Sequence, residues 1–226
     1  AISRRHRGRV DTDSMTIVHQ GQPMLMRGAP PDQARLAMIL LHGRGASAED
    51  ILLLAAGLPQ LEVAYFAPQA ANNTWYPNRF VAPVATNEPH LSSALETIAN
   101  LVNEVVARGV PHERLMVLGF SQGACLALEF AARHPRRYAG VFGLSGALIE
   151  NGDRPRHYAG DMAGTPVFLG CSEADFHIPT ERVHRSADVF RQLNASVTER
   201  IYPGLGHSVN EDELVFIGEV MRKAAQ

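Results

Sequence analysis

The sequence predicts a single α/β domain with a mostly parallel central sheet, helices on both faces and no large lid domain. Short apolar runs typical of buried strands alternate along the chain with longer stretches that have the period of amphipathic helices. The 226 residues are 46% hydrophobic and 19% charged, which is enough to build one full hydrophobic core. No repeat or linker divides the chain, so one domain of this class is expected.

Charge and cysteine content exclude several classes of protein. The net charge of −2 gives no general attraction to nucleic acid or to an anionic membrane, so no nucleic-acid partner is expected. No apolar stretch approaches the length of a membrane span. Cys125 and Cys171 lie far apart and are interpreted as buried thiols rather than a disulfide. Without a visible secretory signal the expected location is cytoplasmic. The sequence does not determine the oligomeric state, so a homodimer is an open alternative.

The first residues differ in character from the rest of the chain. Residues 1–14 contain four arginines, at positions 4, 5, 7 and 9, and no apolar period. They form either a basic arm for an acidic partner or a flexible extension ahead of the domain. We favour the extension, with Met15 as a natural start, and assign the domain to residues 15–226. Between Met15 and Arg27, apolar runs on both sides of Gly21-Gln22-Pro23 predict an antiparallel edge hairpin.

Apolar patterning and chain-breaking residues define the remaining elements. Pro30 and Pro31 precede the first buried strand, while Gly109 and Pro111 end the longest helix. Asn210 and Glu213 form a capping-box pattern ahead of the last helix. In chain order we expect strands at 36–41, 63–66, 115–118, 139–145, 165–171 and 197–202, and helices at 48–58, from 92 to before 109, at 124–132, from 180 and after 210, with irregular segments at 68–91 and 150–164.

The pentapeptide Gly119-Phe120-Ser121-Gln122-Gly123 lies between a predicted buried strand and a predicted buried helix. A strand that turns directly into a helix brings the residues two before and two after the tip close together, so glycine fits both positions. Ser121 would then occupy a strained tip with its hydroxyl exposed at the helix N-terminus. This strand–turn–helix context is the nucleophile elbow, and an ordinary Gly-flanked turn is the weaker interpretation.

A serine nucleophile needs a histidine base and an acid that orients the base, and the elbow fold places them in the order Ser, acid, His. Ser172-Glu173-Ala174-Asp175 follows one predicted strand, and His207 follows the last one on a glycine-rich loop. We prefer Asp175 to Glu173, because the later residue can turn toward the histidine and Asp has one fewer rotatable bond. His177 either touches substrate or is a solvated loop residue. No metal-binding spacing such as H-E-x-x-H occurs, so no metal is expected.

A glycine-bearing loop, His42-Gly43-Arg44-Gly45, follows the first buried strand. In this kind of site one backbone N–H of the oxyanion hole comes from such a loop, and the other comes from the residue after the nucleophile. We therefore assign the N–H groups of Arg44 and Gln122, with Gly45 as the alternative to Arg44. His42 is expected to support the loop. Neither common phosphate-binding glycine pattern is present.

The irregular segment 68–91 holds four prolines and the only tryptophan of the chain. Loops of this length inside a compact domain are uncommon and often functional. Trp75 and Tyr76 either form an aromatic wall for substrate or pin the loop by packing against it, and the sequence favours neither interpretation.

The motifs Leu41-His42-Gly43, Gly119-Phe120-Ser121-Gln122-Gly123, the Asp175 loop with Ile178-Pro179, and Tyr202-Pro203-Gly204-Leu205-Gly206-His207 resemble the phospholipase/carboxylesterase family. This is the acyl-protein-thioesterase-like branch of the α/β hydrolases, and the resemblance runs from about Leu36 to the C-terminus. It implies an α/β-hydrolase fold and a Ser-His-Asp carboxylesterase that acts on small ester substrates without a cofactor. Acyl-protein or lysophospholipid (thio)esterase is the close alternative.

Two departures from the family bear on substrate choice. Arg44 stands where thioesterases of the family often have an apolar residue, so short or medium acyl chains are expected. The residue spacing in the Trp75 loop also differs from that of the family, which leaves the choice of substrate open. A hydrolase-fold protein that binds without catalysis is the alternative from a different class.

Overall fold

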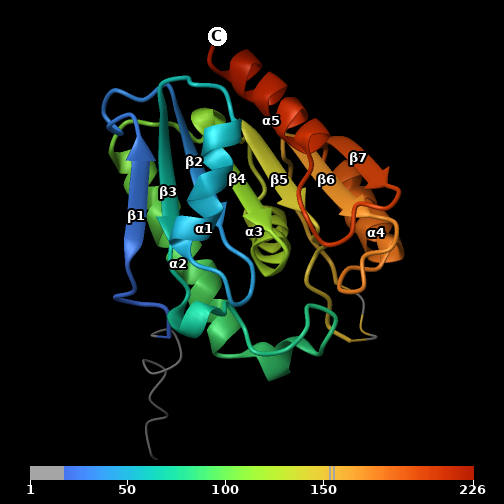
Figure 1. Cartoon of the computed structure of the whole chain (residues 1–226). Helices are drawn as coiled ribbons and strands as arrows, with labels where there is room; N and C mark the ends of the chain where they lie inside the picture. Colours follow the sequence, from blue (N-terminus) through green and yellow to red (C-terminus); the bar gives the residue numbers. More distant parts are fainter. Residues whose placement is uncertain (1–17, 153, 155) are drawn as a thin grey trace, which may run out of the picture.

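The computed structural model describes residues 18–152, 154 and 156–226, and within them seven strands form one sheet (Figure 1). The strand order is β1-β3-β2-β4-β5-β6-β7. Only β1 runs antiparallel to its neighbour, and the remaining pairs are parallel. The strands are β1 (Met24–Gly28), β2 (Leu36–Leu41), β3 (Val63–Pro68), β4 (Leu115–Phe120), β5 (Gly140–Leu144), β6 (Pro166–Ser172) and β7 (Ser196–Tyr202). This mixed sheet with flanking helices confirms the predicted fold class.

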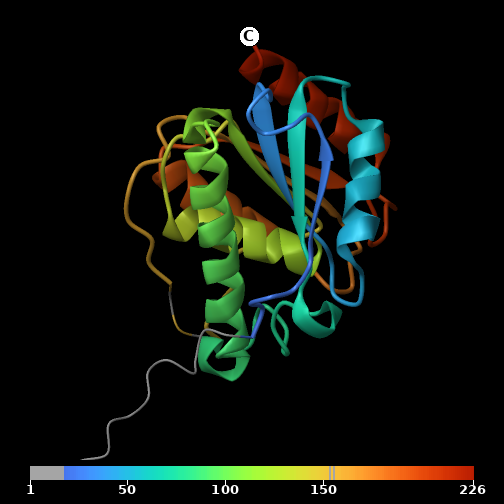
Figure 2. The same cartoon turned by 90° about the vertical axis from the view of Figure 1, so that its left-hand side faces the viewer.

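Helices cover both faces of the sheet, as two perpendicular views show (Figures 1 and 2). The helices are α1 (Ala48–Leu52), α2 (His90–Ala107), α3 (Gln122–Arg133), α4 (Thr180–Gln192) and α5 (Glu211–Ala224). Alternate side chains of β2 enter two separate cores: Ile39 belongs to the core that contains residues of α2, α3 and α4, whereas Met38 belongs to the core that contains residues of α1 and α5. Because both faces of each inner strand are covered, the strands are apolar throughout rather than alternating.

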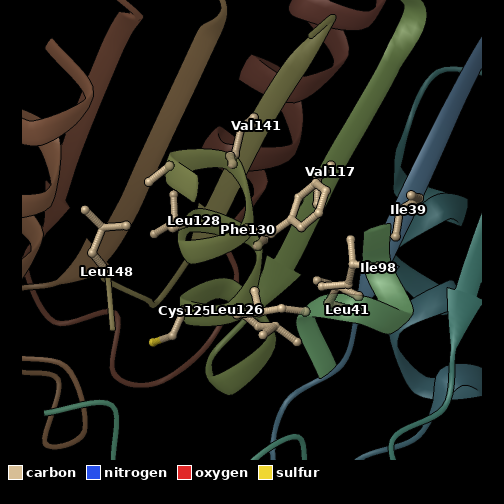
Figure 3. Packing of buried hydrophobic residues seen from close by; sticks show 14 of the residues in the cluster. Ile39, Leu41, Ile98, Val117, Cys125, Leu126, Leu128, Phe130, Val141 and Leu148 are labelled. Atoms are coloured by element: carbon tan, nitrogen blue, oxygen red, sulfur yellow. The ribbon is translucent and has the colours of Figure 1, made fainter. Parts of the chain in front are cut away.

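Helix α3 lies at the centre of the larger core. Its residues from Gln122 to Ala132 are all buried, as predicted from the nearly continuous apolar sequence. Figure 3 shows Leu128 and Phe130 beside Val117 and Val141 of the sheet. Such a helix cannot shift without opening the core, so the residue at its N-terminus is held firmly against the sheet.

The structure corrects several predicted elements. The hairpin predicted between Met15 and Arg27 is wrong over the described residues: residues 18–21 form a turn, and β1 pairs with β3, far along the chain. Positions 15–17 of that prediction lie outside the described residues. The helix predicted at 48–58 is α-helical only to Leu52 and continues as the 3-10 helix Leu53–Gly57. Helix α2 begins at His90 rather than Ser92, and segment 68–91 contains 3-10 turns at Ala71–Asn73 and Val84–Asn87. The extension predicted at 1–14 lies outside the described residues.

Over the ranges that the structure describes, no helix combines the length and the apolar character needed to cross a bilayer.

Helix α5 begins at the predicted capping box, which contains a fully buried carboxyl group. Asn210 and Glu213 exchange side-chain and backbone hydrogen bonds of 2.9 and 3.0 Å. The Oε1 atom of Glu213 faces Gly170 of β6 and has no hydrogen-bond partner among the described residues. Burial raises the pKa of Glu213 from an ordinary value of 4.5 to about 7, and the bond from Asn210 opposes this only in part. The folded protein therefore holds this proton more tightly than the unfolded chain does.

We predict that Glu213→Gln stabilises the protein at pH 8. Ionisation of Glu213 costs no stability below the unfolded pKa of about 4.5, and the cost grows until the pH passes the folded pKa of about 7. A neutral glutamine removes that cost, so denaturant unfolding should show a gain of roughly 1–3 kcal/mol at pH 8 and a smaller gain at pH 5. Glu211→Gln, at an exposed position of the same helix turn, is the control and should show no such gain. Equal gains in the free energy of unfolding at pH 5 and pH 8 would contradict the raised pKa of Glu213.

Candidate active site

The turn between β4 and α3 has the geometry of a nucleophile elbow. Ser121 has φ 56° and ψ −118°, a backbone conformation that L-residues rarely adopt. A Cβ atom on Gly119 would lie 2.1 Å from the carbonyl oxygen of Gly123, and one on Gly123 would lie 2.1 Å from that of Leu41. Both positions therefore require glycine. At Gly119 the reason is the predicted approach of residue 123, whereas at Gly123 the nearest atoms belong to the backbone of Leu41 and His42. The Ser121 N–H donates to Leu144 O at 2.9 Å and fixes the tip to β5.

Ser121, His207 and Asp175 lie within hydrogen-bond distance in series. His207 Nδ1 is 2.7 Å from Asp175 Oδ2, and His207 Nε2 is 2.7 Å from Ser121 Oγ. An ionised carboxylate cannot donate, so the Nδ1 atom carries the proton and Nε2 is free to accept from the Ser121 hydroxyl. The structure thus brings the three predicted residues together from the ends of three different strands, and their catalytic roles stay a prediction.

Asp175 is held by several donors in addition to the histidine. Its Oδ1 atom accepts from the N–H groups of His177 at 2.8 Å and Ile178 at 3.1 Å. The Cys171 thiol lies 3.8 Å from Oδ2. Burial acts to raise the pKa of Asp175, but the bonds from His207 and the two backbone N–H groups outweigh it, so the pKa is lowered. Glu173 is exposed on the same loop, and of the two carboxylates only Asp175 reaches His207.

Ser172 joins the loop that holds the acid to the loop that holds the histidine. Its hydroxyl oxygen, which is fully buried at the end of β6, accepts from Gly206 N–H at 3.0 Å and Ala174 N–H at 3.3 Å. Sequence reasoning missed this contact. The position of a serine at the last residue of a strand was the only available signal.

Two backbone N–H groups beside Ser121 have no hydrogen-bond acceptor within residues 18–152, 154 and 156–226. They belong to Arg44 and to Gln122, the first residue of α3. The alternative donor, Gly45, is engaged, because its N–H donates to Asn73 O at 2.7 Å. A Cβ atom on Gly43 would lie 3.4 Å from the Ser121 Cβ, so the loop passes directly beside the serine. The structure thus brings both predicted donors to the side of Ser121, and their role as an oxyanion hole stays a prediction.

The His42 ring supports the same loop, as expected. It is fully buried, with Nδ1 donating to Gly43 O at 2.8 Å and Nε2 accepting from Ala70 N–H at 3.1 Å. Burial lowers the pKa of His42, the direction expected for a neutral buried imidazole. The ring therefore serves as a fixed spacer between the loop and β3.

The structure places the Trp75 side chain in the core and not in the lining of the site, so of the two interpretations left open for Trp75 it agrees with a loop pinned by its own packing and not with a substrate wall. Its side chain is fully buried, its indole N–H donates to His42 O at 2.9 Å, and its ring packs on that of His42. The Gln122 side chain binds the backbone N–H of Trp75 and the carbonyl oxygen of Tyr76, both at 2.8 Å. The loop is thus pinned by its own aromatic residue and by the elbow.

A cavity of about 260 Å³ opens over Ser121 and His207. The residues that line it are Arg44, Tyr76, Arg79, Phe80, Ser121, Gln122, Cys125, His177, Ile178 and His207. Of the three residues considered for substrate contact, Tyr76 and His177 line the cavity and Trp75 does not. The His177 ring stands edge-on to the His207 ring. The side chain of Arg44 donates to the carbonyl oxygens of Tyr76, Pro77 and Asn78 at 2.8–3.0 Å. These bonds connect the cavity wall to the loop of residues 42–45, which we call the oxyanion loop after its predicted role.

Elsewhere in the described chain no second site of this kind is present. A larger cavity of about 480 Å³ lies between segment 148–158 and α4 and shares no lining residue with the first. Its one serine, Ser186, donates to Arg182 O and has no histidine beside it. The described residues contain no group of three or more His, Cys, Asp or Glu side chains placed to hold a metal ion.

Comparison with known proteins identifies relatives across most of the chain. The model of the phospholipase/carboxylesterase family matches residues 28–225. Acyl-protein thioesterase 1 of Eremothecium gossypii is 32% identical over 210 residues, covering 81% of this chain and 87% of the relative. The protein of the same name from Saccharomyces cerevisiae is 27% identical over 216 residues, covering 84% and 93%. The crystal structure of a phospholipase/carboxylesterase from Dyadobacter fermentans is 40% identical, with a TM-score of 0.85 and coverage of 89% and 96%.

Proposed function

Because the chain belongs to the phospholipase/carboxylesterase family of hydrolases, we propose that it hydrolyses carboxylic esters through a triad of Ser121, His207 and Asp175. The observation that carries this proposal is the 2.7 Å contact between Ser121 Oγ and His207 Nε2, with Asp175 bound to the opposite ring nitrogen. A strained serine beside a correctly oriented base is an arrangement that packing alone does not require.

In the first half of the proposed reaction, Ser121 Oγ bonds to the ester carbonyl carbon while its proton passes to His207 Nε2. The carbonyl oxygen gains negative charge and is stabilised by the N–H groups of Arg44 and Gln122. Asp175 stays ionised and balances the imidazolium that forms. The tetrahedral intermediate then releases the alcohol, which takes the proton from Nε2, and leaves an acyl group on Ser121.

The second half repeats these steps with water. His207 removes a proton from the water, whose oxygen attacks the acyl carbon, and the Ser121–acyl bond breaks as Ser121 regains the proton. The products are the free acid and the unchanged enzyme. Every group used is a side chain or backbone N–H of this chain, so the proposal needs no cofactor.

The acyl group is proposed to be short or medium in length. The cavity of about 260 Å³ is smaller than the 300–1,000 Å³ typical of clefts that enclose drug-sized ligands. The Arg44 side chain, tied to three carbonyl groups, cannot move aside to extend it. Thioester hydrolysis is the runner-up, because two of the relatives are named acyl-protein thioesterases. The cytoplasmic location, the homodimer and the absence of a nucleic-acid partner stay predictions of the sequence.

We predict that a serine-directed fluorophosphonate labels the wild-type protein and fails to label Ser121→Ala. Loss of the nucleophile should lower kcat on an activated ester by several orders of magnitude, since removal of a triad serine costs about 10⁶ in a comparable enzyme. Mass spectrometry of the labelled peptide locates the adduct. A folded wild-type protein that takes no label would favour the non-catalytic binding protein, and activity above one per cent in Ser121→Ala would indicate another nucleophile.

We predict that Asp175→Asn and Glu173→Gln differ greatly in activity. An asparagine favours the wrong His207 tautomer, which costs about 10⁴ in kcat in a comparable triad. Glu173 is exposed and does not reach His207, so its variant should lose less than about tenfold. Both are assayed on one activated ester, with circular dichroism to confirm folding. An inactive Glu173→Gln enzyme beside an active Asp175→Asn enzyme would reverse the acid assignment.

We predict that kcat/KM rises with acyl length only over short chains. Each methylene buried in an apolar tunnel would contribute about 0.8 kcal/mol, and a small cavity stops that gain early. Matched ester and thioester series from two to sixteen carbons measure the length limit and the preference for oxygen or sulfur together. A steady rise to the longest chain would show a groove beyond the described cavity, and a consistent excess for the sulfur series would establish the thioesterase alternative.

A further inference from the structure

The lining of the Ser121 cavity has an unusual balance of charge. It contains two guanidinium groups and two imidazoles, and no aspartate or glutamate side chain. Acids around it are already engaged: Asp175 faces His207, and Glu150, whose backbone N–H donates to Phe80 O, pairs with Arg182. Glu129, which acts electrostatically on Tyr76 and Cys125 of the lining, pairs with Arg133 and Arg156. The cavity is therefore cationic within a chain whose net charge is −2.

The two arginines are bound only to neutral oxygen atoms. Arg44 donates to three backbone carbonyl groups, and Arg79 donates to His177 O at 3.3 Å. Among the described residues neither forms an ion pair with a carboxylate. Carbonyl groups do not cancel the charge, so these two exposed arginines leave positive potential at the mouth of the cavity.

Arg79 is the arginine free to bind a ligand. A guanidinium has five N–H donors, and the single long contact to His177 O leaves most of those of Arg79 unused. Its backbone is nevertheless fixed, since buried Asn87 binds both Asn78 N–H and Arg79 O. The side chain thus extends from a braced turn at the edge of the cavity, where structural packing does not require a cation.

Resting on the proposed esterase function, we propose that the substrate is an ester that also carries a carboxylate, bound by Arg79 beside the Ser121 cavity. The planar guanidinium matches such a group with two parallel hydrogen bonds. Arg44 adds positive potential from a fixed position. The anion lies on either the acyl group or the alcohol, and both sources are tested separately.

The test compares esters that differ only in that charge. For the acyl group, the 4-nitrophenyl monoester of glutaric acid is paired with its neutral methyl ester. For the alcohol, 4-carboxyphenyl acetate is paired with its methyl ester, and each rate is divided by the spontaneous rate of the same compound. The wild type should prefer the anionic member of at least one pair by about tenfold in kcat/KM, and added salt should reduce this preference.

Arg79→Gln should bring that preference to within about twofold. Arg27→Gln, which removes the same charge from an exposed position on β1, should keep it. No preference in either pair, or a preference that survives in Arg79→Gln, overturns the inference while hydrolysis of the neutral esters upholds the esterase function. If the wild type hydrolyses none of the four, the esterase proposal fails. In that case, equilibrium binding of the same four esters to Ser121→Ala tests the inference. About tenfold tighter binding of the anionic member of at least one pair supports it, and equal binding within both pairs overturns it.

Discussion

The geometry of the site depends on one close contact of three backbones. At the elbow, β2, β4 and α3 approach so closely that no Cβ atom fits on Gly119 or Gly123. That contact compresses the turn, and the Ser121 backbone takes a strained conformation that the buried helix behind it maintains. The same contact brings the oxyanion loop beside the serine. The parallel arrangement of the sheet then delivers the acid and the histidine to the same edge, because both follow the carboxyl ends of neighbouring strands.

Much of this could be predicted from sequence, because the requirements are local or topological. Apolar patterning reveals the order of strands and helices. That order requires glycine on both sides of Ser121, an acid after one strand and a histidine after the last. The contacts of Gln122, Arg44 and Trp75 could not be predicted in the same way. Their side chains bind backbone carbonyl or N–H groups of segments far away, and every residue has such groups, so the partner leaves no trace in the sequence.

The wrong hairpin and the undecided position of Trp75 both depend on contacts with distant parts of the chain. The hairpin before Arg27 was predicted from neighbouring apolar runs, yet β1 gains more by pairing with β3, whose outer edge would otherwise be unpaired. Trp75 lies in a segment without periodicity, and a lone aromatic residue in a loop gives no indication of whether it faces solvent or core. In this chain the Trp75 side chain faces the core because its indole N–H donates to His42 O and its ring packs against the His42 ring.

Arg44 links two parts of the site that carry different tasks. Its backbone N–H is proposed to stabilise the oxyanion that forms on the ester carbonyl. Its guanidinium donates hydrogen bonds to three consecutive carbonyl groups of the opposite cavity wall. The wall and the loop consequently behave as one stiff body, so the dipoles aimed at the reacting oxygen need little rearrangement when a substrate arrives. Stiffness of this kind also narrows the range of shapes that the cavity can adopt. A new substrate would therefore be accommodated more readily through changes on the Phe80 and His177 side than through movement of the Arg44 side.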